Sequence, residues 1–92
     1  MKYSVILTSS FKKDAKRCKK RGYNTALLRE AIRILSEKGM LPSSYRPHKL
    51  SGKYSDCWEC HLQPDWLLVW KKNNNELILT MTATGTHDDL FR

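Results

Sequence analysis

The chain has 92 residues, of which 40% are hydrophobic, and a formal net charge of +8 at pH 7. This length accommodates one hydrophobic core, so we expect residues 1–92 to form a single domain. No segment approaches the roughly 20 apolar residues that span a bilayer, and the N-terminus lacks the apolar region and cleavage site of a signal peptide. We therefore expect a cytoplasmic protein with no membrane contact.

The positive charge is concentrated in the first half of the chain. Residues 1–46 contain 12 Lys or Arg and 3 Asp or Glu, whereas residues 47–92 contain 5 and 6. A basic half of this kind is typical of proteins that bind polyanions. The cysteine count of three is odd, which fits a reducing compartment better than a disulfide framework.

The first elements in the chain are a short strand and a basic helix. The β-branched run Tyr3–Thr8 predicts the strand, and Ser9-Ser10 offers an N-cap to a helix that begins near Phe11 and ends at Gly22. The cations of this helix are Lys12, Lys13, Lys16, Arg17, Lys19, Lys20 and Arg21. A solvated surface is the alternative interpretation, but such surfaces usually mix charge signs. We expect the helix to contact the phosphate backbone of a nucleic acid.

A second helix is predicted from Asn24 or Thr25 to about Lys38, with Gly39 as its stop signal. The irregular stretch 40–53 follows, and loops of this length in small domains are often functional. Its candidate substrate-binding and catalytic side chains are Arg46, His48, Lys49 and Lys53. This loop is expected to bring an imidazole and several cations beside a phosphate.

Three further strands are predicted over Cys57–Leu62, Trp66–Lys71 and Glu76 to about Ala83. The turn-forming stretches 63–65 and 73–75 are short, so these strands should form an antiparallel meander. The order β-α-α-β-β-β predicts an α+β fold. In this fold an antiparallel sheet carries both helices packed on one face.

Alternation along the first of these strands separates its side chains into two sets. They are Cys57, Glu59 and His61 on one face, and Trp58, Cys60 and Leu62 on the other. The second set is expected to join the core. The first set places a carboxylate beside an imidazole on the face away from the helices, where the other two histidines can converge.

The C-terminal stretch 84–91 has the sequence TGTHDDLF. Gly85 permits a sharp exit from a strand, and Leu90 and Phe91 are expected to pack back onto the domain and fix the direction of His87. The alternative is a hydrophobic latch with an incidental histidine. Paired imidazoles suit a reaction that removes one proton and donates another, such as RNA cleavage by its own 2′-hydroxyl. That reaction requires no cofactor or metal.

The segment 57–61 also matches the C-x-x-C-H pattern of haem attachment, and with His48 it offers a candidate zinc site. Haem attachment normally follows export, for which no signal is present. Strand geometry sends Cys57 and Cys60 to opposite faces, so neither site is favoured. A zinc site would become more credible if the segment were a loop.

Three stretches together resemble the RelE-type toxins of bacterial toxin–antitoxin systems, specifically the YafQ branch. They are residues 48–52, residues 59–68, and residues 84–87 with 89–91. The resemblance implies a microbial-ribonuclease-like fold, mRNA cleavage in the ribosomal A site with inhibition of translation, a cognate antitoxin as partner, and a monomeric free toxin. It implies an acid–base set formed by His48, His61, Asp65 and His87, with Trp66 and Phe91 shaping the substrate site.

Ala83 departs from this family pattern, because many relatives have arginine immediately before the Thr-Gly-Thr/Ser-His motif. That arginine would stabilise the phosphate. Either Lys49, Lys53, Arg46 or an imidazolium takes its place, or activity is reduced. The alternative to a nuclease is therefore a weakened or inactive module that binds RNA or the antitoxin on the same scaffold.

Overall fold

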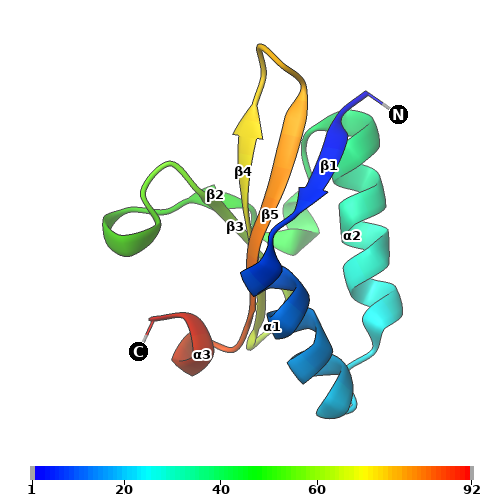
Figure 1. Ribbon diagram of the computed structural model, residues 1–92, viewed down its shortest axis with the longest axis vertical. Coiled ribbons are helices and arrows are strands. Elements are labelled where there is room, and N and C mark those ends of the chain that lie inside the picture. Colours follow the sequence, from blue (N-terminus) through cyan, green and yellow to red (C-terminus); the bar gives the residue numbers. More distant parts are fainter. Residues whose placement is uncertain (1, 92) are drawn as a thin grey trace.

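The computed structural model describes residues 2–91 of the chain (Figure 1). The elements in chain order are β1 (Ser4–Leu7), α1 (Ser9–Lys20), α2 (Thr25–Lys38), the short 3-10 helix η1 (Ser43–Tyr45), β2 (His48–Lys49), the 3-10 helix η2 (Gly52–Tyr54), β3 (Trp58–Gln63), β4 (Trp66–Asn73), β5 (Ile78–Gly85) and α3 (His87–Phe91). None of the helices described is both long and apolar enough to cross a bilayer.

The five strands form one sheet in the order β1-β5-β4-β3-β2. The pairs β2–β3, β3–β4 and β4–β5 are antiparallel, as predicted for the meander, and the edge strand β1 runs parallel to β5. A parallel neighbour needs a long crossover, and most of the chain, including α1 and α2, separates β1 from β5. The predicted α+β class is confirmed, with a sheet that is mostly antiparallel.

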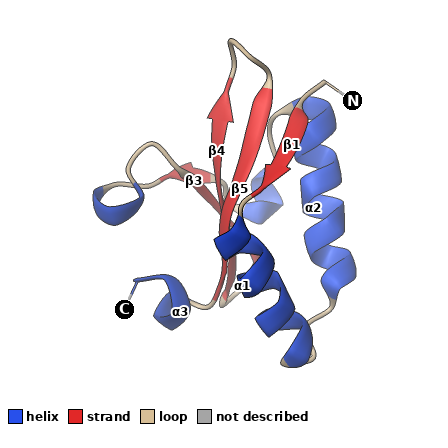
Figure 2. Ribbon diagram, viewed as in Figure 1, coloured by secondary structure: helices blue, strands red, loops and turns tan. Residues whose placement is uncertain are grey.

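Helices α1 and α2 cover one face of the sheet, which we call the helix face (Figure 2). The main core lies between these two helices and the sheet. It includes Phe11, Cys18, Leu28, Ala31, Leu35, Cys60, Trp66, Leu68, Trp70, Leu79 and Met81. The opposite face, which we call the open face, carries a smaller cluster of Cys57, Leu67, Val69, Ala83 and Leu90. Segment η2 and helix α3 lie on that side (Figure 1). The open face is therefore the side on which functional side chains can meet a substrate.

The boundaries of two predicted elements differ from the structure for local reasons. Thr8 rather than Ser9 or Ser10 caps α1, because its hydroxyl oxygen accepts the Phe11 amide at 3.1 Å. Strand β5 begins at Ile78 rather than Glu76, because the Asn73 side chain accepts the Glu76 amide at 3.0 Å and closes the turn. The strand continues to Gly85, two residues beyond the predicted end.

The short elements were not predicted, and two of them, β2 and α3, matter for the site. Strand β2 comprises only His48 and Lys49, which pair with Glu59 and Trp58 inside the stretch expected to be irregular. Helix α3 forms where a tail held by Leu90 and Phe91 was expected, and it begins at His87. Both elements carry a histidine to the open face, so the two corrections bear directly on the functional site.

Candidate active site: three histidines on the open face

Strand register brings the histidines of two separate segments onto the open face. His48 lies opposite Glu59, and Glu59 lies opposite Val69, whose side chain belongs to the open-face cluster. His61 lies opposite Leu67 in the same way. Directly opposed residues of a ladder point to the same side. His48, Glu59 and His61 therefore share the open face, as the alternation of the strand predicted over Cys57–Leu62 indicated for the last two.

The three imidazoles form a row. Ring centroids are 6.3 Å apart between His48 and His61, and 5.9 Å apart between His61 and His87. His87 reaches this row from the first turn of α3, directly after β5 ends at Gly85. Residues 13 and 26 positions apart in sequence are thus neighbours in the row, and the spacing suits a group held between two proton-transferring side chains.

Glu59 is a buried carboxylate between two of the rings, with only 4% of its surface exposed. Its Oε1 lies 3.1 Å from Nε2 of His48 and 3.9 Å from Nε2 of His61. A buried carboxylate is stable only when paired or hydrogen-bonded, and these imidazoles supply that partner. Nδ1 of His48 lies 3.1 Å from the Arg46 carbonyl oxygen, so both ring nitrogens face acceptors.

Asp65 and His87 form a carboxylate–imidazole pair. The Asp65 Oδ1 accepts the His87 backbone N–H at 2.9 Å and lies 2.6 Å from Nδ1 of the same ring. These two contacts lower the pKa of Asp65, the backbone hydrogen bond contributing most. An ionised Asp65 therefore favours the proton on Nδ1 and leaves Nε2, which has no hydrogen bond among the described residues, to exchange a proton with a substrate.

Helix α3 is fastened to α1 through Asp89. Asp89 N–H donates to the Thr86 hydroxyl at 3.1 Å and the Asp89 carboxylate accepts the Thr86 amide at 2.9 Å, which is a capping box. The same carboxylate receives two hydrogen bonds, at 2.7 and 3.1 Å, from Arg21, the C-cap residue of α1. A Cβ at Gly85 would lie 2.7 Å from Asp89 Oδ2, so only glycine allows this close approach. The start of α3, and with it His87, is thereby fixed.

The Asp89 anchor predicts a pH-dependent loss of stability. Hydrogen bonds from Arg21, and then from Thr86, hold the pKa of Asp89 well below its ordinary value of 3.8. A depressed carboxylate pKa stabilises the folded state above that ordinary value, and the stabilisation is lost as the pH falls further toward the folded-state pKa. Asp89→Asn should therefore lower the free energy of unfolding at pH 7 by about 0.5–1 kcal/mol, the size of a partly exposed ion pair. The difference from wild type should shrink below pH 3.8.

Urea unfolding at several pH values measures this difference. Asp88→Asn is the matched control, since it removes the neighbouring carboxylate of α3, which has no ion pair among the described residues. Equal losses for the two variants at pH 7 would contradict an anchor at Asp89.

The fold and this geometry agree with a known family. The model of the bacterial toxin of type II toxin–antitoxin system, YafQ, matches residues 3–92. The chain belongs to the YafQ toxin family. The mRNA interferase toxin YafQ of Escherichia coli strain K12 is 31% identical to this chain over 88 residues, which are 95% of this chain and 94% of that protein. The YafQ branch expected from the three sequence stretches is thus confirmed.

Two solved structures show how closely the fold is shared. The E. coli DinJ–YafQ toxin–antitoxin complex contains a chain with a TM-score of 0.88 and 28% identity, covering 100% of both chains. A metal-bound toxin from Helicobacter pylori has a TM-score of 0.87 and 34% identity, covering 97% of this chain and 99% of that one. The RelE-like fold expected from the sequence is therefore confirmed.

Two residues expected to contact substrate lie elsewhere in this YafQ-family chain. Trp66 is 1% exposed, packs against Tyr23 in the main core, and donates its Nε1–H to the Thr84 hydroxyl at 2.9 Å. It can shape the site only through Thr84, at the end of β5. Lys49 pairs with Trp58, whose side chain packs on the helix-face core, so Lys49 points away from the histidines. Neither side chain lies beside the imidazoles, and a contact of either one with substrate stays a prediction.

The remaining loop residues and Phe91 stay near the histidines. The Arg46 backbone carbonyl holds His48, and the Lys53 ammonium lies 5.3 Å from the centroid of the Tyr54 ring. That ring meets Phe91 edge-on at 5.5 Å, and Phe91 is 43% exposed beside His87. Of the predicted Leu90-Phe91 anchor, Leu90 is the buried part. Phe91 leaves an aromatic surface next to the imidazole row.

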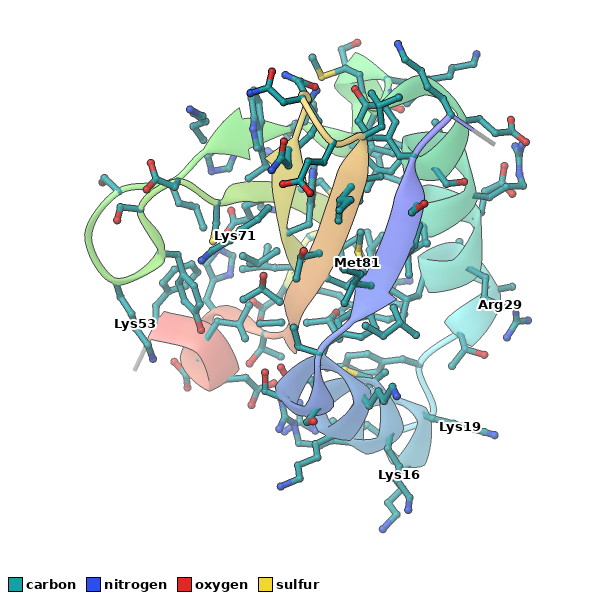
Figure 3. All side chains as sticks on the ribbon, turned by 45° about the horizontal axis from the view of Figure 1, so that its top comes forward. Lys16, Lys19, Arg29, Lys53, Lys71 and Met81 are labelled. Carbon is teal, nitrogen blue, oxygen red and sulfur yellow. The ribbon has the colours of Figure 1, made fainter. Side chains whose placement is uncertain are left out.

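Among the cations of α1, the lysines are free to bind phosphate and the arginines are engaged. Lys12, Lys13, Lys16, Lys19 and Lys20 are exposed, and Figure 3 shows Lys16 and Lys19 projecting away from the domain. Arg17 instead pairs with Asp14 at 3.2 Å and donates to the Thr84 carbonyl oxygen at 3.4 Å. Arg17 therefore serves the junction between α1 and β5, and its place in the phosphate-binding set stays a prediction.

The cysteines of the C-x-x-C-H segment do not form a shared site. Cys57 belongs to the open-face cluster and Cys60 to the main core, on opposite sides of the sheet. Burial raises the pKa of both thiols, that of Cys60 to about 12, so neither is a ready thiolate ligand. Within residues 2–91 no group of three or more His, Cys, Asp or Glu side chains is arranged to hold a metal ion.

Glu59 is the site residue that the predicted acid–base set omitted. Its position in the strand placed it on the correct face beside His61, but alternation alone does not show burial. The Glu59 carboxylate can contact the imidazoles of both His48 and His61 because β2 pairs His48 directly with Glu59.

Proposed function

We propose that this chain is a ribosome-dependent endoribonuclease toxin that cuts mRNA and so inhibits translation in the cytoplasm. The observation that carries the proposal is the row of three imidazoles on the open face, one of them held by Asp65. Its relative YafQ is an mRNA interferase toxin. Imidazoles exchange protons near neutral pH, and paired acid and base groups are what 2′-hydroxyl attack on a phosphodiester requires.

In the proposed reaction a base takes the proton of the 2′-hydroxyl, whose oxygen forms a bond to the adjacent phosphorus. The bond from phosphorus to the 5′-oxygen breaks, and an acid protonates that oxygen. We assign the acid to His87, because Asp65 orients the ring and leaves Nε2 open. The base is then His48 or His61, and the other imidazole stabilises charge on the phosphate. Each proton is handled by a side chain, so the scheme requires no metal ion.

The alternative function is a weakened or inactive module that binds RNA or the antitoxin. Ala83, at the position where many relatives carry arginine, is buried under the open-face cluster and supplies no charge. Cleavage of mRNA on programmed ribosomes, with primer extension to locate the cuts, separates the two functions. We expect the wild-type chain to cut within the A-site codon. A folded chain that binds ribosomes but makes no cut would establish the alternative.

We also propose that the chain is monomeric when free and is neutralised by a cognate antitoxin. The basic half of the chain favours an acidic partner, and the YafQ chain of the DinJ–YafQ toxin–antitoxin complex has the same fold. Co-expression of the chain with its neighbouring reading frame, followed by size-exclusion chromatography, tests this. A chain that purifies alone from such a co-expression would contradict the antitoxin proposal.

Helix α1 is proposed to dock on the ribosomal RNA backbone. Replacing Lys12, Lys13, Lys16 and Lys19 together by Gln should weaken ribosome binding and lower the magnitude of the slope of log affinity against log salt by up to about 0.7–0.9 for each lost phosphate contact. The cut positions should not change, because phosphate contacts do not read bases. Filter binding across a salt series measures the slope. A double variant Lys2→Gln/Lys38→Gln, which removes charge outside α1, is the control. An altered codon preference would contradict the proposal.

A further inference from the structure

A second cationic feature lies on the open face, beyond the histidine row. Lys71 follows Val69 by two residues on β4 and lies opposite Thr80 of β5. Side chains two apart on a strand share a face and are about 7 Å apart along it. Lys71 therefore points to the same side as Val69, Glu59 and His48, one step farther along the sheet.

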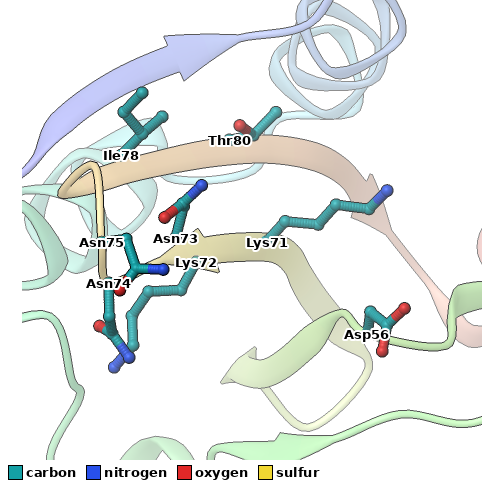
Figure 4. A pocket seen from close by; sticks show the side chains of 8 residues that line it. All are labelled: Asp56, Lys71, Lys72, Asn73, Asn74, Asn75, Ile78 and Thr80. Carbon is teal, nitrogen blue, oxygen red and sulfur yellow. The ribbon is translucent and has the colours of Figure 1, made fainter.

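The ammonium of Lys71 is unpaired and close to the open-face cluster. No ion pair or hydrogen bond among the described residues involves Lys71, and its side chain is exposed. Its charge lowers the pKa of the Cys57 thiol, opposing the larger effect of burial, which places it near that residue. In Figure 4 its side chain extends away from the Asn73–Asn75 turn, along the direction of β5 toward the strand's C-terminal end.

Lys71 lines a depression with a volume of about 630 Å³. Polar side chains from the β4–β5 hairpin, among them Thr80 and Asn75, form its floor and one end, and Asp56 stands at the other side (Figure 4). The neighbouring cation Lys72 is not available in the same way, because its ammonium donates to the Gly39 carbonyl oxygen at 2.8 Å. Lys71 is thus the cation of this hairpin that can meet a ligand.

We propose that Lys71 and this depression bind a backbone phosphate of single-stranded RNA, outside the bond that is cut. The subsite deepens the proposed nuclease function and rests on it for the identity of the ligand. An RNA strand held at the histidine row and extended along β4 passes over Lys71 next. The polar floor favours a solvated backbone over an apolar ligand, and an exposed ammonium without a partner binds phosphate at no cost in internal contacts.

Binding measurements that combine protein variants with modified RNA probes test the contact. The probe is an RNA oligonucleotide with a 2′-deoxy nucleotide at the cleavage position, so that it is bound but not cut, and fluorescence anisotropy measures its affinity at several salt concentrations. Lys71→Gln should weaken binding about two- to fivefold, the size of an exposed ion pair, and reduce the salt slope by about 0.7. Asp56→Asn removes the acid at the depression and should tighten binding. Lys38→Gln, at the end of α2, should change neither quantity.

Neutral methylphosphonate linkages, placed one at a time in the probe, locate the phosphate. At one position the neutral linkage should weaken binding of the probe to wild type but leave its binding to Lys71→Gln unchanged. On programmed ribosomes Lys71→Gln should raise KM by a similar two- to fivefold factor with kcat unchanged, since the contact is the same in the ground and transition states.

The outcomes separate this subsite from the nuclease proposal. If wild type cuts mRNA but Lys71→Gln has the wild-type KM and salt slope, the subsite is overturned and the nuclease function stands. If wild type does not cut but binds the probe with the expected dependence on Lys71, the nuclease proposal fails and the RNA contact stands. No binding of the probe by wild type, together with an unchanged KM, also overturns the subsite.

Discussion

His87→Ala is expected to slow mRNA cleavage by about 10²–10⁴-fold, the usual contribution of a general acid or base. The melting temperature should stay close to wild type, because the side chain is 55% exposed. The backbone N–H of residue 87, which donates to Asp65, remains in the variant. The loss should therefore fall on the proton transfer and not on the position of α3.

Single-turnover cleavage on programmed ribosomes measures this effect, with thermal unfolding recorded on the same samples. Asp88→Ala is the matched control: it shortens the adjacent exposed side chain of α3 and leaves the Asp65–His87 pair intact. If His87→Ala cuts at the wild-type rate, the C-terminal segment is only a hydrophobic latch, and the acid must be sought at His48 or His61.

Much of this fold is readable in the sequence because its signals are local. The spacing of Phe11 and Cys18 gave the buried side of α1, and Gly39 gave the end of α2, where the structure has a left-handed cap with φ of 71°. Alternation in the strand predicted over Cys57–Leu62 separated His61 from Cys60, and the structure places them on opposite faces of the sheet. Periodicity and turn chemistry thus fixed which side of the sheet holds the site.

The sequence predictions differ from the structure where a very short element or the pairing with a neighbouring strand decides which way a side chain points. Strand β2 has two residues, too few for any period, and yet its register sends Lys49 away from the site and His48 into it. Trp66 begins a run in which every residue through Trp70 is buried, because β4 is central and covered on both sides. Its side chain is therefore enclosed in the core, which the sequence pattern of the strand does not reveal. Helix α3 did carry a signal, the Thr86–Asp89 capping box, which was not recognised.

Glu59→Gln should slow cleavage by about 10–10²-fold, a part of the full acid–base contribution. The carboxylate contacts Nε2 of His48 at 3.1 Å and lies 3.9 Å from Nε2 of His61, and no other carboxylate within the described chain lies within ion-pair distance of these two rings. Glutamine keeps the size of the side chain but brings an N–H₂ group where two ring nitrogens need an acceptor. The rings then lose both their orientation and the charge that stabilises a protonated imidazole.

A double-mutant cycle distinguishes this positioning role from general damage to the fold. If Glu59 acts through His48, Glu59→Gln should cost much less in a His48→Ala background than in wild type, since the group it orients is already absent. If Glu59→Gln only damaged the fold, its fold-loss in cleavage rate would be the same in the His48→Ala background as in wild type. Glu37→Gln, which removes an exposed carboxylate of α2 paired with Arg33, serves as the control and should leave cleavage unchanged. A wild-type rate for Glu59→Gln would show that the buried carboxylate holds β2 against β3 and takes no part in the chemistry.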